Sequence, residues 1–363
     1  MDLVEASWIK YPLRLKFEAG TSRGVMTSKI SYFIFLRTET GVTGIGECSL
    51  LPGLSIDDRP GYEDQLIRLC ENFKQSNMGI VNELSKFLED RIGHRWPSMR
   101  MAFEMAGLDL IRGGERVIFQ NGFLKGEGIP INGLIWMGDR KFMLQQIKRK
   151  IESGYTCIKM KIGAMDYDIE LDLLRYIRKQ FQSKDLILRV DANGAFTPQN
   201  VMEKLGRLEK LNIHSIEQPI EAGQWEQMHK LCRITPIPVG LDEELIGEYD
   251  IVKKKDLVQQ IMPHYLILKP SLLGGFDATR EWIHIAESHN IGWWITSALE
   301  SNIGLNAICQ FTYGLKVTRE QGLGTGQLFS NNIESPLEVN QGEIRYRVDG
   351  KWDLSNLGVE TVQ

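Results

Sequence analysis

Six polar residues recur at nearly constant spacing through the second half of the chain, each at the end of a short strand-like segment. Successive members lie 30, 26, 25, 27 and 28 residues apart: Lys161, Asp191, Glu217, Asp242, Lys269 and Ser297. One such interval accommodates a strand, a helix and their loops, so the pattern predicts repeated β–α units and a parallel sheet. A polar group at the carboxyl end of each strand is typical of a (β/α) barrel, because catalytic groups gather at that mouth.

The segments between these residues support the alternation of strands and helices. Thr156–Ile162 and Leu186–Val190 are short and strand-like, and residues 166–181 between them carry apolar side chains on one helical face. We expect a further helix to open at Thr197, with Pro198 in its first turn. An open doubly wound sheet would place its ligand at one crevice and would not need polar groups after five or six successive strands, so we favour the barrel.

The first 125 residues have a different texture. Up to about residue 60 the chain is β-rich, with a strand-like run at Ile30–Leu36 and a glycine-rich turn at Gly41–Gly46. Helical periodicity follows within residues 63–111. We therefore assign residues 1–125 to one domain and residues 126–329 to the barrel, and we expect the C-terminal segment 330–363 to complete the first domain.

Composition and charge exclude several classes of partner. The 43 Lys and Arg residues nearly balance the 47 Asp and Glu residues, for a net charge of −4, so we expect neither nucleic acid nor a membrane surface as partner. The amino terminus lacks the features of a secretory signal, and no stretch approaches the roughly 20 apolar residues of a membrane helix. Five scattered cysteines form neither a metal motif nor a disulfide framework, which favours a cytoplasmic protein.

Three of the six residues are acids that would meet at the mouths of adjacent strands. Three carboxylates so close together would repel one another unless a cation neutralised them. They belong to Asp191, Glu217 and Asp242. Hard oxygen ligands without clustered His or Cys favour Mg²⁺, for which Mn²⁺ can substitute. The alternative is that each acid only caps the following helix, which suits a single Asp better than three acids in register.

Lysines accompany these acids at the same expected mouth. Lys159 and Lys161 lie two residues apart on one strand and therefore face the same side, and Lys269 ends another strand just before Pro270. Burial and neighbouring cations favour the neutral form of a lysine, which can then act as a base. Lysine bases beside a divalent cation suit removal of a proton α to a carboxylate, because the cation stabilises the resulting enediolate. For any one of these lysines, an ordinary surface charge is the alternative.

Seven short segments, in this order along the chain, resemble the enolase superfamily in its muconate-lactonising subgroup. They are Gly44–Ser49, Pro97–Ala106, Lys159–Lys161, Asp191–Asn193, Glu217–Pro219, Asp242–Glu243 and Lys269–Pro270. Each is weak alone, but together they span most of the chain. Within the subgroup, Gly46–Ser55 and Ser297–Gly304 are most similar to the o-succinylbenzoate synthase family. The resemblance implies an α/β fold, a modified (β/α)8 barrel of TIM type arranged as (β/α)7β, with an α+β capping domain.

The resemblance also implies a role for each site residue. The metal ligands would be Asp191, Glu217 and Asp242, supported by Asn193 and Glu243. Lys161 would be the general base and then the acid, and the cations beside the substrate would be Lys159 and Lys269. The residues that bind the substrate would be Ser297, Glu300, Ser301 and Gly304. Two lid loops of the capping domain, near residues 19–29 and 50–57, would include Gly20, Thr21, Ser22, Arg23, Leu51 and Pro52. An ordinary solvated hairpin is the alternative for the first loop.

The implied reaction is a magnesium-dependent dehydration by a carbon–oxygen lyase. A syn β-elimination through an enediolate would convert 2-succinyl-6-hydroxy-2,4-cyclohexadiene-1-carboxylate to 2-succinylbenzoate in menaquinone synthesis. The partner would be this small carboxylate, and assembly into a homo-oligomer is left open.

Three other functions are compatible with parts of the sequence. Racemisation of N-succinyl amino acids, or epimerisation of dipeptides, would use Lys161 and Lys269 as opposed bases. Related dipeptide epimerases bind the substrate ammonium with acids near the eighth strand, and Gly322–Gly326 carries no acid, which counts against a dipeptide. A metal-free Schiff-base enzyme would use one of the same lysines as its nucleophile. The third function is a binding barrel without catalysis, which no residue pattern favours.

Overall fold

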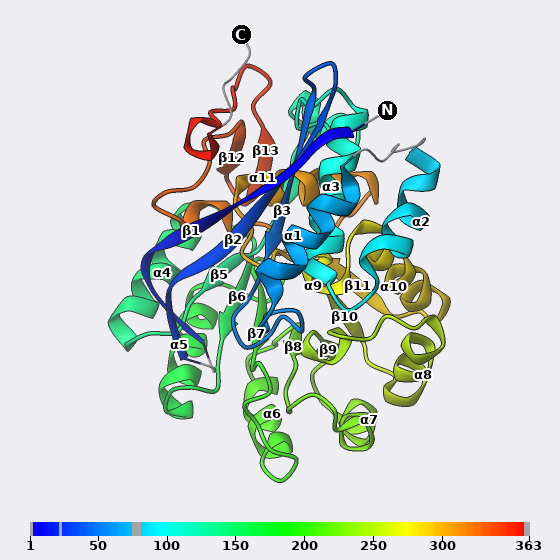
Figure 1. The fold of residues 1–363 in the computed structure, drawn as a ribbon. Helices are drawn as coiled ribbons and strands as arrows, with labels where there is room; N and C mark the ends of the chain where they lie inside the picture. The colour runs from blue at the N-terminus through cyan, green and yellow to red at the C-terminus, as the bar shows by residue number, and fades with distance from the viewer. Residues whose placement is uncertain (1–2, 22–23, 75–80, 359–363) are drawn as a thin grey trace.

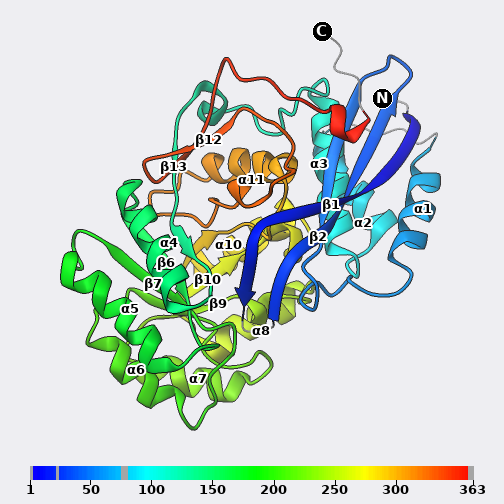
Figure 2. The same ribbon diagram turned by 90° about the vertical axis from the view of Figure 1, so that its left-hand side faces the viewer.

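The computed structural model describes residues 3–21, 24–74 and 81–358. A cap built on an antiparallel sheet lies against a second unit in which helices surround a parallel sheet (Figure 1). The long hairpin of the cap extends toward the region where the parallel strands end, as the quarter-turn view also shows (Figure 2). The two units therefore meet beside the mouth of the parallel sheet.

The cap pairs a three-stranded meander with a layer of helices. Its strands lie in the order β1 (Leu3–Thr21), β2 (Gly24–Thr38) and β3 (Thr43–Ser49). The helices that follow are α1 (Tyr62–Phe73), α2 (Val81–Ile92) and α3 (Pro97–Ile111). The prediction of a β-rich start followed by helices before residue 112 is confirmed.

Two glycines of β3 allow this strand to lie directly on helix α3. A Cβ atom at Gly44 would come within 2.0 Å of the carbonyl oxygen of Ala106, and one at Gly46 within 1.8 Å of the carbonyl oxygen of Ala102. Real Cβ atoms do not approach so closely, so only glycine permits this contact between strand and helix. Close packing of β3 on α3 therefore explains the two glycines of the Gly44–Ser49 segment.

The second unit is the parallel barrel expected from the spacing of polar residues. Its strands lie in sequence order in one sheet: β5 (Gly133–Ile135), β6 (Cys157–Lys161), β7 (Ile187–Asp191), β8 (Ser215–Glu217), β9 (Val239–Leu241), β10 (Tyr265–Leu268) and β11 (Gly292–Ile295). The helices between and after them are α4 (Arg140–Glu152), α5 (Tyr167–Gln180), α6 (Val201–Glu209), α7 (Trp225–Ile234), α8 (Ile251–Ile261), α9 (Pro270–Leu273), α10 (Phe276–Ser288) and α11 (Asn302–Gly314).

A two-residue segment occupies the eighth position of this barrel. Gln321 forms a parallel bridge with Ile131, just before β5, and Gly322 forms one with Thr296, just after β11. The main-chain N–H of Gly322 also donates to the carbonyl oxygen of Ile295 at 2.8 Å. The chain therefore connects the first and seventh strands without a full strand, which confirms the (β/α)7β arrangement.

One predicted helix start is wrong. Helix α6 begins at Val201 and not at Thr197. The main-chain N–H of Thr197 donates to Asn200 Oδ1 at 3.0 Å, and the N–H of Asn200 donates to the carbonyl oxygen of Thr197 at 3.1 Å, which closes a turn before the helix. Pro198 disfavours helical geometry at the residue before it, so this turn delays the helix.

The C-terminal segment contacts both units. Its strands β12 (Leu337–Asn340) and β13 (Glu343–Tyr346) form a small sheet with β4 (Ile129–Pro130), at the start of the barrel. Asn331 meets the cap instead, because its carbonyl oxygen accepts from Tyr11 at 2.9 Å. The domain limits at residues 125 and 330 stay a prediction, and this segment links cap and barrel. None of the described helices is long and apolar enough to cross a membrane.

Candidate active site

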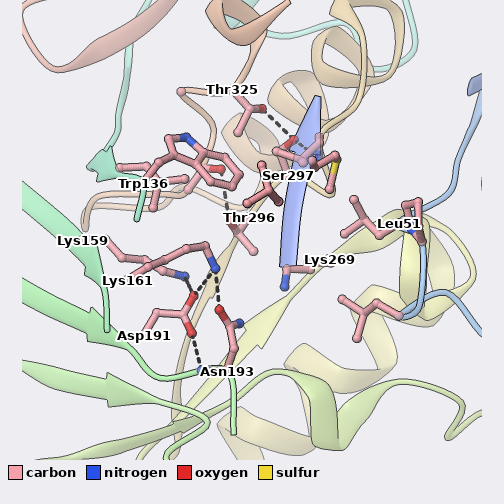
Figure 3. Close-up of a pocket in the computed structure, with 18 of the residues that line it drawn as sticks. Leu51, Trp136, Lys159, Lys161, Asp191, Asn193, Lys269, Thr296, Ser297 and Thr325 are labelled. Atoms are coloured by element: carbon pink, nitrogen blue, oxygen red, sulfur yellow. Dashed lines mark hydrogen bonds and ion pairs between the residues drawn. The ribbon is translucent and has the colours of Figure 1, made fainter. Parts of the chain in front are cut away.

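The polar series predicted from the sequence lies at the carboxyl ends of the barrel strands. Lys161, Asp191 and Glu217 are the last residues of β6, β7 and β8, and they are aligned, because Lys161 pairs with Asp191 and Asp191 with Glu217. Asp242 follows β9 directly, and Lys269 follows β10. Parallel pairing brings these ends to one edge of the sheet, so the side chains converge, as Figure 3 shows for Lys161, Asp191 and Lys269.

The converging side chains form a buried array of ion pairs. Lys159 Nζ lies 2.7 and 2.6 Å from the two carboxylate oxygens of Glu217 and 3.2 Å from Asp191 Oδ2. Lys161 Nζ lies 3.0 Å from the same Asp191 oxygen (Figure 3), and Lys269 contacts Asp242. Each carboxylate is at most 3% exposed. The three acids and three lysines therefore form one charge cluster, largely withdrawn from water.

Burial and mutual charge set the ionisation of this cluster. Burial opposes the charged form of Asp191, but the lysines around it outweigh this effect and hold its pKa below the usual range. At Glu217, burial and the charge of Asp191 raise the pKa to about 8, although Lys159 opposes the shift. Burial would lower the pKa of Lys159 and Lys269, yet the carboxylates dominate and raise both.

Asn193 connects the charge cluster to Glu243. Its Oδ1 accepts from Lys161 Nζ at 2.6 Å, and its Nδ2 donates to Glu243 Oε1 at 2.9 Å. Its main-chain N–H donates to Asp191 Oδ1 at 3.0 Å, and its φ of +43° lies in the left-handed region, which asparagine tolerates better than most residues. Both supporting residues predicted from the sequence thus lie beside the cluster.

A cavity of about 380 Å³ opens directly onto the lysines. Lys159, Lys161 and Lys269 reach this cavity (Figure 3). The first two lie on β6 and Lys269 follows β10, and three strands separate β6 from β10 in the sheet. Much of its wall is apolar, from Leu51, Leu54, Leu134, Trp136 and Leu299. Its polar lining includes Asn132, Thr296, Ser297 and Thr325. The cavity therefore suits a small, partly apolar molecule with a polar or charged group at the lysines.

The cap supplies one side of this cavity through the two expected lid loops. The tip of the β1–β2 hairpin lines it from Gly24 to Ser28, and the second loop lines it through Leu51 and Pro52. Gly20 lies against the barrel, because a Cβ there would come within 2.7 Å of the carbonyl oxygen of Met137. The first loop therefore belongs to a hairpin, and this hairpin faces the cavity and not only solvent. Thr21 ends β1, and the predicted lid residues Ser22 and Arg23 lie outside the described residues.

The four residues expected to bind substrate divide into two groups. Ser297 lines the cavity and accepts from Thr325 at 2.7 Å. Glu300, Ser301 and Gly304 do not line it, because their polar groups are used inside the protein. Glu300 accepts from Ser271 and Ser297, both at 2.5 Å, while Ser301 and Gly304 donate to Glu47. These three residues lie behind the cavity wall, and their contact with the substrate stays a prediction.

Sequence reasoning missed several residues of this region. Trp136 covers Lys161, whose ammonium group lies 5.9 Å from the centre of the indole ring. Lys29 and Glu47 are buried charges between the cap and the loop after β11. Glu47 belongs to the Gly44–Ser49 segment, which was a signal that could have been followed. No sequence motif marks Trp136 or Lys29, because the residues that they contact come from distant parts of the chain.

The donor set of the cluster fits a hard divalent cation. Asp191, Glu217 and Asp242 present carboxylate oxygens from adjacent strand ends, which is the ligand chemistry that Mg²⁺ prefers. In residues 3–21, 24–74 and 81–358, no three acidic, His or Cys side chains already surround one point as they would a metal ion. Each carboxylate instead contacts a lysine.

Comparisons with known proteins identify the family. Residues 143–349 match the family model described as enolase C-terminal domain-like. The chain is 45% identical to an o-succinylbenzoate synthase of Desulfotalea psychrophila, across 94% of this chain and 99% of the relative. A crystal structure of MenC from the same organism superposes with a TM-score of 0.86 and 40% identity, covering 95% of this chain and all of that one.

A more distant relative has a different name. It is an N-succinylamino acid racemase of Thermus thermophilus, 26% identical across 84% of this chain and 80% of the relative. The family model covers more than half of the chain, and the relative at 45% identity covers nearly all of it. The chain therefore belongs to the enolase superfamily and, within it, to the o-succinylbenzoate synthase family.

Proposed function

We propose that this protein is a magnesium-dependent o-succinylbenzoate synthase, a carbon–oxygen lyase. It would remove water from 2-succinyl-6-hydroxy-2,4-cyclohexadiene-1-carboxylate to form 2-succinylbenzoate. The observation that carries the proposal is the placement of Lys161 and Lys269 on opposite strands of one cavity, beside three buried carboxylates. The 45% identity to a protein of that name supports the choice of substrate.

Asp191, Glu217 and Asp242 would hold the magnesium ion, for which Mn²⁺ can substitute. When bound, the ion neutralises the substrate carboxylate and stabilises the charge that develops on it. The lysines that contact these acids in the structure would then be released toward the cavity. Asn193 and Glu243 would orient the site through the hydrogen bond that joins them, at 2.9 Å.

Lys161 would carry the proton through the reaction. As a neutral amine it takes the proton α to the carboxylate, and the electron pair of that C–H bond forms the enediolate with the carboxyl group. The ammonium form then returns the proton to the leaving hydroxyl on the same face, so water departs and the ring becomes aromatic. Lys159 and Lys269 would remain charged and stabilise the anion, in agreement with the direction of their pKa shifts.

The rest of the cavity would bind and enclose the substrate. Trp136, Leu51 and Leu299 offer an apolar surface for the ring and exclude water from it. Ser297 and Thr325 offer hydroxyl groups for the succinyl side chain. The substrate is small enough for a cavity of about 380 Å³.

The direct test is turnover of the cyclohexadiene substrate, followed by the ultraviolet absorbance of the aromatic product. We expect conversion with Mg²⁺ and its loss after treatment with EDTA, with recovery on adding Mg²⁺ or Mn²⁺. Full activity in EDTA, together with borohydride trapping of the substrate on a lysine, would instead support a Schiff-base enzyme. No conversion under any condition would refute the proposed reaction.

Racemisation of N-succinyl amino acids is a second candidate, and the two opposed lysines favour it. One lysine could remove the α-proton and the other could return a proton to the opposite face. Incubation with N-succinylphenylalanine in D₂O distinguishes the two activities, since rapid α-deuteration with inversion would add racemase activity. Dipeptide epimerisation is less well supported, because Gly322 and Gly324 line the cavity where an acid would be needed.

We further place the enzyme in the cytoplasm, in menaquinone synthesis, as a proposal that follows from the reaction. All five cysteines are buried and unpaired with one another, which suits a reducing compartment. Assembly into a homo-oligomer also stays a proposal, which measurement of the molar mass in solution would test.

A further inference from the structure

Lys29 is a buried cation of strand β2 that contacts the barrel. Its side chain is 2% exposed, and its ammonium group donates to the carbonyl oxygen of Leu299 at 2.9 Å and to Ser49 Oγ. Ser49 Oγ in turn donates to the carbonyl oxygen of Ala298 at 3.0 Å. Two cap residues thus hold successive carbonyl groups in the loop of residues 296–301, which joins β11 to α11.

That loop has an unfavourable backbone conformation at its centre. Leu299 has a φ of +61°, in the left-handed region that branched and bulky side chains rarely adopt. Both of its main-chain polar groups are bonded: its N–H donates to Ser297 Oγ at 3.0 Å, and its carbonyl oxygen accepts from Lys29. Leu299 and Ser297 both line the cavity that also contains Lys161. A strained residue is thus held in place beside the expected substrate.

Buried carboxylates support the same loop on either side. Glu47 of β3 accepts from the main-chain N–H groups of Ser301 and Gly304, at 2.9 and 3.0 Å, where helix α11 begins. Glu300 accepts from Ser297 Oγ. Burial lowers the pKa of Lys29, although the carboxylates of Glu47 and Glu300 oppose that shift. A residue without a hydrogen-bond donor at position 29 would leave the Leu299 carbonyl without its donor from the cap.

We propose that Lys29 is a positioning residue, which holds Leu299 in the left-handed conformation and thereby places the Ser297 hydroxyl and the Leu299 side chain on the cavity wall. Without the ammonium group, residue 299 relaxes toward negative φ, and both side chains leave their places. The consequence for substrate binding rests on the proposed function, because that wall would hold the succinyl side chain. The consequence for the loop does not.

The first test replaces Lys29 by methionine, which keeps the length of the side chain and removes its donors. Lys16→Met is the matched control, since Lys16 is an exposed lysine of the same hairpin and does not line the cavity. In Lys29→Met we expect amide hydrogen exchange of the peptide covering residues 297–301 to accelerate about tenfold in the ligand-free protein. We expect KM for the cyclohexadiene substrate to rise about tenfold, with kcat within threefold of wild type. Lys16→Met leaves all three quantities unchanged.

A second test asks whether strain at Leu299 is what Lys29 offsets. Glycine adopts positive φ without cost, so in a Leu299→Gly background the Lys29→Met change is expected to accelerate exchange less than threefold. Equal effects of Lys29→Met in both backgrounds would overturn this explanation. If Lys29→Met does not fold, as judged by circular dichroism, Ser49→Ala replaces it, because that change removes both an acceptor of Lys29 and the donor to the Ala298 carbonyl in the same loop.

The outcomes separate this inference from the proposed function. If wild-type protein does not convert the cyclohexadiene substrate, the proposed function fails, and hydrogen exchange alone decides whether Lys29 positions the loop. If wild type converts it, faster exchange with an unchanged KM overturns the role in substrate binding. Unchanged exchange in a folded Lys29→Met protein overturns the inference as a whole.

Discussion

The ammonium group of Lys161 lies 2.6 Å from Asn193 Oδ1, so the proposed base is held by a neutral amide as well as by a carboxylate. Asn193 is itself fixed by its bond to Glu243, 50 residues further along the chain. This chain of contacts defines where the amine lies before a substrate arrives. It also allows the base, its support and the metal ligands to be tested separately.

Lys161→Ala should remove nearly all turnover and leave the fold intact. General base catalysis by a positioned side chain is worth roughly 10²–10⁴-fold, so we expect a loss of about 10³-fold in kcat. Lys148→Ala, at an exposed lysine of α4, is the control and should retain full activity. Steady-state kinetics and circular dichroism provide the measurement. Retention of even a tenth of wild-type activity by Lys161→Ala would argue against its role as base.

Asn193→Ala should lower kcat by about 10- to 100-fold, the usual cost of losing a residue that orients a site. The change also places alanine at positive φ, which carries a separate cost in stability. Asn212→Ala controls for that cost, because Asn212 has a φ of +49° and does not line the cavity. Equal kinetic losses in the two variants would mean that backbone strain, and not the contact with Lys161, is responsible.

Glu217→Gln and Asp191→Asn should weaken metal binding. Each change removes one negative charge and one hard oxygen ligand while preserving the size of the side chain. We expect the Mg²⁺ concentration for half-maximal activity to rise at least tenfold, and calorimetry to show the same shift without substrate. Glu226→Gln, at an exposed acid of α7, should change neither. Unaltered Mg²⁺ affinity in both site variants would refute the assignment of these ligands.

Glu104 should make the protein less stable as the pH rises. Burial raises the pKa of this α3 carboxyl to about 8, from its ordinary value of 4.5. Between these values the folded state keeps a proton that the unfolded state loses, so the free energy of unfolding falls with rising pH. The loss begins near pH 4.5 and is complete above about pH 8.

Glu104→Gln removes this titration and keeps an acceptor for the main-chain N–H of Phe276, which lies 2.7 Å from Glu104 Oε2. Urea unfolding from pH 5 to pH 9 should show the variant gaining stability relative to wild type across that window. Glu71→Gln, at an exposed acid of α1, should run parallel to wild type. A constant difference between Glu104→Gln and wild type at all pH values would contradict the assigned pKa.

Gly46→Ala should destabilise the cap strongly. The added methyl group would lie 1.8 Å from the carbonyl oxygen of Ala102, which backbone on both sides keeps from moving, so we expect a loss of about 3 kcal/mol or more. Gly206→Ala is the control, since a Cβ there meets nothing within 4 Å and the residue lies inside helix α6. That change should stabilise by roughly 0.5–1 kcal/mol. Urea unfolding measures both.

The register of the site was predictable because it depends on local order along the chain. Each polar residue ends a strand or follows one closely, and strands of one parallel sheet end at one edge. The positions of Asp191 and Glu217 therefore follow from the spacing. The same reasoning failed at Thr197, where a side chain of the turn, Asn200, competes with the first helical hydrogen bonds. Spacing along the chain also does not predict which side chains of the loop after β11 face the cavity.

The amino-acid sequence by itself determined the alternation of strands and helices, the polar residue at each strand end, and the family to which these motifs belong. Only the tertiary structure decided that Ser297 faces the cavity while Glu300 and Ser301 lie behind its wall. The physical reason is the distance between partners, since Lys29 meets Leu299 across 270 residues of chain. Strand periodicity is a property of neighbours in sequence, whereas the orientation of a loop depends on the cap that folds against it.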